Sequence, residues 1–83
     1  MPLFLDIHHH VAGAKASDVA AAHVKDLETQ DKHGVKYVRY WFDEASGTIF
    51  CLVEAPNQEA AAQVHREAHG LVADEIHEVV EGS

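Results

Sequence analysis

The chain is poor in the residues that cross-link a fold or attach it to polyanions. It has one cysteine, so an internal disulfide is excluded and we expect the cytoplasm as its compartment. Lysine and arginine number 6 against 14 aspartates and glutamates, which gives a net charge of −8 with the histidines neutral. That balance argues against nucleic acid and anionic membranes as partners. No apolar run approaches the roughly 18 residues of a membrane span.

The length and the first residues set further bounds. The 83 residues are enough for one domain, so we expect a single domain over residues 1–83, with a small core that dimerisation would enlarge. The first residues, MPLFLDI, carry no basic segment, and Asp6 interrupts their apolar run. We therefore expect no signal peptide.

The order of apolar and polar residues predicts six elements. Strands are predicted over residues 2–10, 35–42, 48–54 and 75–80, where side chains alternate in polarity or are β-branched and aromatic. Helices are predicted over residues 17–33 and 57–69, with Ser17 and Asn57 as N-caps and with Gly34 and Gly70 beyond their ends. Residues 12–14 predict a loose turn.

This order predicts an α+β fold of the ferredoxin-like βαββαβ type, with a four-stranded antiparallel sheet in the order 4-1-3-2. Both helices are expected on one face of the sheet. The first helix has an apolar arc made of Val19, Ala20, His23, Val24 and Leu27. The open face would carry either Tyr37, Arg39 and Trp41 or Val38, Tyr40 and Phe42. Because either set exposes aromatic area, we expect a sheet-to-sheet homodimer.

Histidine is the residue in excess, with 8 in 83 residues and three in a row at residues 8–10. The topology brings six of them towards one end of the sheet: His8, His9, His10, His65, His69 and His77. His65 and His69 are spaced i, i+4, so both rings lie on one helix face, about 6 Å apart at Cβ and within reach of one metal ion. Glu67 comes one residue too late for the zinc-protease motif, and we reject that class.

Carboxylates accompany these histidines. Asp6 and His8 share one face of the first strand, while His23, Asp26 and Gln30 border the apolar arc of the first helix. We predict a metal site with a core of Asp6, His8, His23 and His65, and with Glu54 and His69 as further ligands. Imidazole and carboxylate ligands suit Ni, Cu(II), Zn or Fe better than Ca or Mg.

The site prediction carries conditions. Asp6 and His8 must face the helices, or they would meet the dimer interface instead. Glu54 lies at the other end of its strand, so it joins the site only if the partner subunit supplies it. Asp26 is interpreted as a solvated or supporting residue, and Cys51 as a small buried hydrophobe.

The motifs also resemble a known family. They are F-L-D-I-H at 4–8, A-H-V-K-D-L-E-T-Q at 22–30, G-V-K-Y-V-R-Y-W at 34–41, I-F-C-L-V-E-A-P at 49–56 and V-H-R-E-A-H-G-L-V-A-D-E-I at 64–76. In this order they resemble the small bacterial DUF4242 proteins, whose named members are cytoplasmic, nickel-binding and nickel-responsive. The resemblance implies a ferredoxin-like homodimer that binds Ni(II) through nitrogen and oxygen ligands. The polar residues at matching positions are Asp6, His8, His23, Asp26, Gln30, Glu54, His65 and His69.

We therefore predict a cytoplasmic protein that binds a divalent transition metal for sequestration or a nickel response. Nickel comes from the resemblance, and the ligand chemistry also admits Cu(II) or Zn(II). The alternative is a small enzyme of the dimeric α+β barrel type, a cofactor-free monooxygenase or isomerase. It would use the cavity under the helices, with His23, Asp26 and His65 as acid and base groups. His9, His10 and His77 depart from the family pattern and leave open a second, external metal site.

Overall fold

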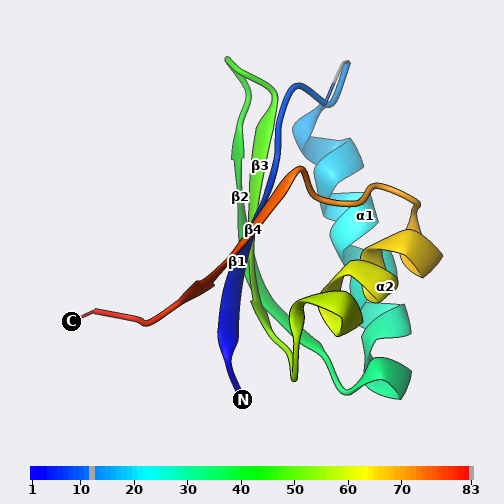
Figure 1. The fold of residues 1–83 in the computed structure, drawn as a ribbon. Helices are drawn as coiled ribbons and strands as arrows, with labels where there is room; N and C mark the ends of the chain where they lie inside the picture. The colour runs from blue at the N-terminus through cyan, green and yellow to red at the C-terminus, as the bar shows by residue number, and fades with distance from the viewer. Residues whose placement is uncertain (12, 83) are drawn as a thin grey trace.

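The computed structural model describes residues 1–11 and 13–82. Its elements are β1 (Leu3–His8), α1 (Ala16–Thr29), the 3₁₀ helix η1 (Gln30–His33), β2 (Lys36–Asp43), β3 (Thr48–Glu54), α2 (Gln58–Ala68) and β4 (Glu75–Val79). The strands form one antiparallel sheet in the order β2-β3-β1-β4, which is the predicted order counted from the other edge. Both helices lie on the same side of the sheet (Figure 1). The predicted ferredoxin-like fold is confirmed.

The register of β1 decides which side chains meet the helices. Phe4, Asp6 and His8 are buried, whereas the residues between them are only partly covered. Successive side chains of a strand point to opposite faces, so Asp6 and His8 face the helices and Leu5 and Ile7 face the open side. The condition on Asp6 and His8 is met.

A β-bulge divides β2. The pairing with β3 shifts between Tyr37 and Arg39, which makes Val38 the extra residue. As a result Tyr37 is buried under the helices, while Trp41 is exposed. Neither predicted set of alternate residues therefore lies on one face. The side-chain oxygen of Gln30 accepts the backbone N–H of Tyr37 at 2.8 Å and so fixes the chain at the bulge.

The helix boundaries follow from capping. α2 begins as predicted, because the side chain of Asn57 accepts the backbone N–H of Ala60 at 2.9 Å. α1 begins earlier than predicted, with Lys15 and not Ser17 as its N-cap. The carboxylate of Asp18 accepts the N–H of Lys15 at 3.2 Å, which is the return half of a capping box. The turn predicted at residues 12–14 includes Ala12, which lies outside the described residues.

The inward face of α1 differs from the predicted apolar arc. Val19 and Asp26 are its buried residues, while Val24 and Leu27 are exposed. Asp26 faces inward because it contacts His65 of α2 and His69 just after it, and those contacts outweigh the exposure of two aliphatic side chains. Neither helix in the described part of the chain is long and apolar enough to cross a membrane.

Candidate metal centre

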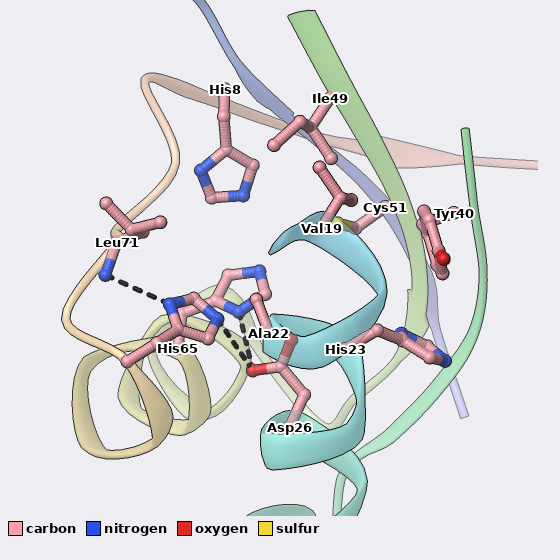
Figure 2. Close-up of a pocket in the computed structure, with 11 residues that line it drawn as sticks. His8, Val19, Ala22, His23, Asp26, Tyr40, Ile49, Cys51, His65 and Leu71 are labelled. Atoms are coloured by element: carbon pink, nitrogen blue, oxygen red, sulfur yellow. Dashed lines mark hydrogen bonds and ion pairs between the residues drawn. The ribbon is translucent and has the colours of Figure 1, made fainter. Parts of the chain in front are cut away.

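A cluster of polar side chains is buried where the end of β1 meets the two helices. β1 contributes Asp6 and His8, α1 contributes Asp26, and α2 with the residue after it contributes His65 and His69. All are buried except His69, which is partly buried. Figure 2 shows His65 and Asp26 turned towards each other between the helices. Polar groups are stable in a core only when they are paired, and the contacts within the cluster supply that pairing.

His65 is the centre of the cluster because both of its ring nitrogens face carboxylates. Nδ1 lies 2.8 Å from Oδ1 of Asp26, and Nε2 lies 3.0 Å from Oδ2 of Asp6. A neutral imidazole has one N–H, so only the protonated ring donates to both carboxylates. Burial opposes that charge, but the hydrogen bonds to Asp26 and Asp6 outweigh it and raise the pKa of His65 to about 9.

Asp6 is also contacted by Tyr37, a residue of the bulged strand. The Tyr37 hydroxyl lies 3.0 Å from Oδ2 of Asp6 and 3.1 Å from the carbonyl oxygen of Ala61. Burial and the charge of Asp6 raise the pKa of Tyr37 well above its usual range, so the hydroxyl keeps its proton. Burial also opposes ionisation of Asp6, but the imidazoles of His65 and His8 outweigh it and hold the pKa of Asp6 far below its usual range.

The second oxygen of Asp6 has a different environment. Oδ1 is buried and has no hydrogen-bond partner among the described residues. Nε2 of His8 lies 3.3 Å from it, near enough for an ion pair but without the alignment of a hydrogen bond. Buried polar atoms in native proteins almost always have a partner, so this oxygen is unusual. Together with Nε2 of His8 it offers two ligand atoms of the kind that a divalent transition ion takes.

Asp26 holds the other side of the cluster. Its Oδ1 lies 2.8 Å from His65 Nδ1 and 3.1 Å from His69 Nε2. Burial opposes its ionisation, but the two imidazoles outweigh it and lower the pKa of Asp26. Nδ1 of His69 accepts the backbone N–H of Leu71 at 3.1 Å, so the proton of the neutral ring is on Nε2, which lies within ion-pair distance of Asp26.

Two overlapping sets of side chains bring their ligand atoms within 4.8 Å of one another. They are Asp6, His8, Cys51 and His65, and Asp26, His65 and His69. Burial, followed by the charge of Asp6, raises the pKa of Cys51 far above its usual range, so the thiol stays protonated and is a weak ligand. The first set therefore offers mainly imidazole nitrogen and carboxylate oxygen, which fits Ni, Cu(II) or Zn.

A small cavity borders this first set. Its volume is about 30 Å³, and His8, Cys51 and His65 stand in its wall (Figure 2). That space accommodates an ion or a water molecule. Sites for organic ligands of drug size are roughly ten times larger.

The structure brings together four of the six residues predicted as ligands, namely Asp6, His8, His65 and His69. His23 lines the same cavity but points away from His65 and packs against Tyr40, with the rings tilted by 46° and their centroids 4.8 Å apart (Figure 2). Glu54 pairs across strands with Leu3, at the opposite end of β1 from His8. His23 and Glu54 therefore belong to neither set of converging ligand atoms.

Three further residues take part in the cluster, although the sequence predicts other roles for them: Asp26, Cys51 and Tyr37. Asp26 carried a signal, because it borders the apolar arc of α1 and a polar group there needs a partner. The sequence indicates a role for Cys51 less clearly, since mid-strand cysteines are usually plain core residues. The sequence gives no indication for Tyr37, because its inward position depends on a bulge that simple alternation does not reveal.

Fold and cluster together define a ferredoxin-like domain with a buried histidine–carboxylate centre that can hold a metal ion. The family model described as "Nickel responsive protein SCO4226-like" matches residues 4–79. The crystal structure of SCO4226 from Streptomyces coelicolor A3(2) is similar, with 41% sequence identity, a TM-score of 0.90, and coverage of 98% of this chain and 99% of that one. No curated protein matches. The chain belongs to the SCO4226-like family of nickel responsive proteins, a description that does not include the name DUF4242.

Proposed function

We propose that this protein binds Ni(II) at the set made of Asp6, His8 and His65, and that it sequesters nickel or responds to it. The observation that carries the proposal is the buried Oδ1 of Asp6, which faces Nε2 of His8 at 3.3 Å without a hydrogen bond. The nickel responsive description of the family supports the choice of metal. The ligand types alone would also accept Cu(II) and Zn(II).

The first set of ligands is a better site than the second. Oδ1 of Asp26 is already shared by His65 and His69 at 2.8 and 3.1 Å, so a metal there would have to displace both contacts. Oδ1 of Asp6 has no such hydrogen bond to lose. His65 joins the site by giving up the proton on Nε2, because a metal ligand must be the neutral ring. Nickel binding at this site therefore releases a proton.

The proposal places this binding in the cytoplasm, where the single thiol, Cys51, would remain reduced. Its partner is a second copy of the chain, docked through the open sheet face. That face carries the exposed Trp41 and the partly covered Leu5 and Ile7. The net charge of −8 supports the expectation that nucleic acid and anionic membranes are not partners.

The alternative function, a small cofactor-free enzyme, needs room for an organic substrate. The cavity of about 30 Å³ favours an ion over such a substrate. His23, one of the acid–base residues of that hypothesis, packs against Tyr40 and is turned away from His65. We therefore rank the enzyme below the metal-binding protein.

Calorimetric titration with Ni(II) tests the proposal, with His8→Ala as the variant and His23→Ala as its matched control. Both residues line the cavity, but only His8 belongs to the ligand set. We expect the His8 variant to bind nickel about 10- to 100-fold more weakly, and the His23 variant to bind like the wild type. Equal binding by the wild type and the His8 variant would show that this set is not the nickel site.

A further inference from the structure

A second pair of histidines, His9 and His77, lies on the other face of the sheet, near the end of β1 and in β4. Continuing the alternation of β1, the side chain of His9 lies on the same face as Leu5 and Ile7, opposite the face of Asp6 and His8. In β4, Glu75 pairs with Ile7 and His77 pairs with Leu5. The register therefore places both β4 side chains on the open face, at the edge of the sheet and next to His9.

These three side chains already contact one another. Nε2 of His9 is hydrogen-bonded to Oε2 of Glu75, and Nε2 of His77 lies 3.1 Å from the other carboxylate oxygen. All three side chains are exposed in the single chain, and β4 is the edge strand, so in the proposed dimer they would stand at the rim of the docked face. They can therefore rotate at little cost in desolvation. One carboxylate is thus held between two imidazoles, each presenting the same ring nitrogen.

The backbone beneath the group is fixed by a pair of hydrogen bonds. The N–H of Asp74 donates to the carbonyl oxygen of Ile7 at 2.9 Å, and the N–H of His9 donates to the Asp74 carboxylate at 2.7 Å. These bonds hold the start of β4 against the end of β1. The three side chains therefore project from a defined scaffold and not from a loose tail.

We propose that His9, Glu75 and His77 form a second, external site for a first-row divalent transition ion. Two imidazole nitrogens and a carboxylate are the donors that Ni, Cu(II) and Zn take. The ion would replace the protons that now link the rings to Glu75, and water would complete its coordination. The group shares no residue with the buried cluster and lies on the opposite face of the sheet, so each site stands or fails separately.

A second histidine–glutamate contact shows what distinguishes this group. His33 lies 2.8 Å from Glu67, but Lys32 also binds that carboxylate at 3.1 Å. A lysine on the carboxylate disfavours a cation there, and only one imidazole is present. Glu75 has two imidazoles and, within residues 1–11 and 13–82, no lysine or arginine as an ion-pair partner. His33 is therefore a suitable control position.

Equilibrium dialysis with Ni(II) tests the inference on the protein without a polyhistidine tag. The double variant His9→Ala/His77→Ala removes exposed side chains only, and circular dichroism checks that its fold is retained. We expect it to bind one nickel ion per chain fewer than the wild type at saturating free Ni(II), whereas His33→Ala keeps the wild-type number. An unchanged number in the double variant would overturn the inference.

The variant His8→Ala separates this result from the proposed function. If His8→Ala binds nickel as tightly as the wild type in calorimetry while the double variant loses an ion in dialysis, the external site stands and the buried site fails. If His8→Ala binds nickel more weakly in calorimetry and the double variant keeps the wild-type number of ions, the external site is refuted and the buried one stands.

Discussion

Oδ2 of Asp6 on β1 lies 3.0 Å from Nε2 of His65 on α2, a contact that joins two residues far apart in the chain. It ties the central strand to the second helix through a buried ion pair. On its other side, the His65 ring holds Asp26 of α1 at 2.8 Å. One imidazolium therefore links both helices to the sheet, and the charge of that ring governs how firmly the layers are joined.

The stability of the protein without metal should fall in alkaline solution. The folded state raises the pKa of His65 from 6.5 to about 9, so its contribution is complete below pH 6.5 and is lost as the pH rises through 9. The loss amounts to about 3 kcal/mol in the free energy of unfolding. Asp6 and Asp26 have lowered pKa values, so their contribution is present above about pH 4 and is lost in more acidic solution. Maximum stability is expected between about pH 4 and pH 6.5.

Urea denaturation at several pH values, with a chelator present, measures this curve. Asp26→Asn removes one of the two carboxylate charges that favour the protonated His65 ring, so its alkaline decline should be smaller than that of the wild type. His33→Ala, which changes an exposed contact with Glu67, should follow the wild-type curve. A free energy of unfolding that stays constant from pH 6.5 to pH 9 would contradict the assignment of the imidazolium.

Tyr37→Phe should destabilise the protein although it keeps the aromatic ring. The substitution removes a buried hydroxyl that lies 3.0 Å from Asp6 and 3.1 Å from the Ala61 carbonyl. Loss of a hydrogen bond to a buried charged group costs about 1.5–3 kcal/mol. Tyr40→Phe is the matched control on the same strand and should change the free energy of unfolding by less than about 0.5 kcal/mol. Equal losses in the two variants would show that the Tyr37 hydroxyl has no special role.

The sequence predicted the fold because the signals for it are local. Asn57 caps a helix wherever its side chain reaches a free N–H, and Gly34 adopts the left-handed conformation, with φ 66°, that ends η1. Alternation along β1 also placed Asp6 and His8 on one face correctly. These features depend on residues within a few positions of one another, so they can be read without knowledge of the rest of the chain.

The details of the site depend on tertiary contacts and could not be read in the same way. Periodicity places His23 beside the apolar arc, but the observed rotation of α1 is set by Asp26 reaching α2, and it turns His23 towards Tyr40. The inward position of Tyr37 depends on a bulge in β2, and the backbone N–H of Tyr37 donates to the side chain of Gln30 there. The convergence of histidines predicts that a site exists. Which residues belong to it depends on how the two helices pack, and the sequence does not show that.

The proposed dimer predicts that charge on the open sheet face will separate the subunits. Trp41 on that face and Val24 on α1 are matched positions, since they are 47% and 51% exposed on opposite sides of the molecule. Trp41→Glu should yield particles with the mass of one chain, 9.1 kDa, in sedimentation equilibrium at micromolar concentration. Val24→Glu should leave the mass at twice that value. A monomeric wild type, or a dimer that only the Val24 substitution disrupts, would rule out the sheet face as the interface.

Nickel should raise the melting temperature of the wild type, and two histidine variants should show which ligand set holds it. A ligand that binds only the folded state at 100 times its dissociation constant adds about 2.7 kcal/mol, which is roughly 10–20 °C for a domain of this size. His65 belongs to both sets, but His8 and His69 belong to one each. Because Asp6 Oδ1 has no hydrogen bond while Asp26 Oδ1 is shared by two rings, His8→Ala should lower the rise by half or more and His69→Ala should keep most of it. The reverse pattern, read by differential scanning calorimetry with and without Ni(II), would move the nickel site from Asp6 to Asp26.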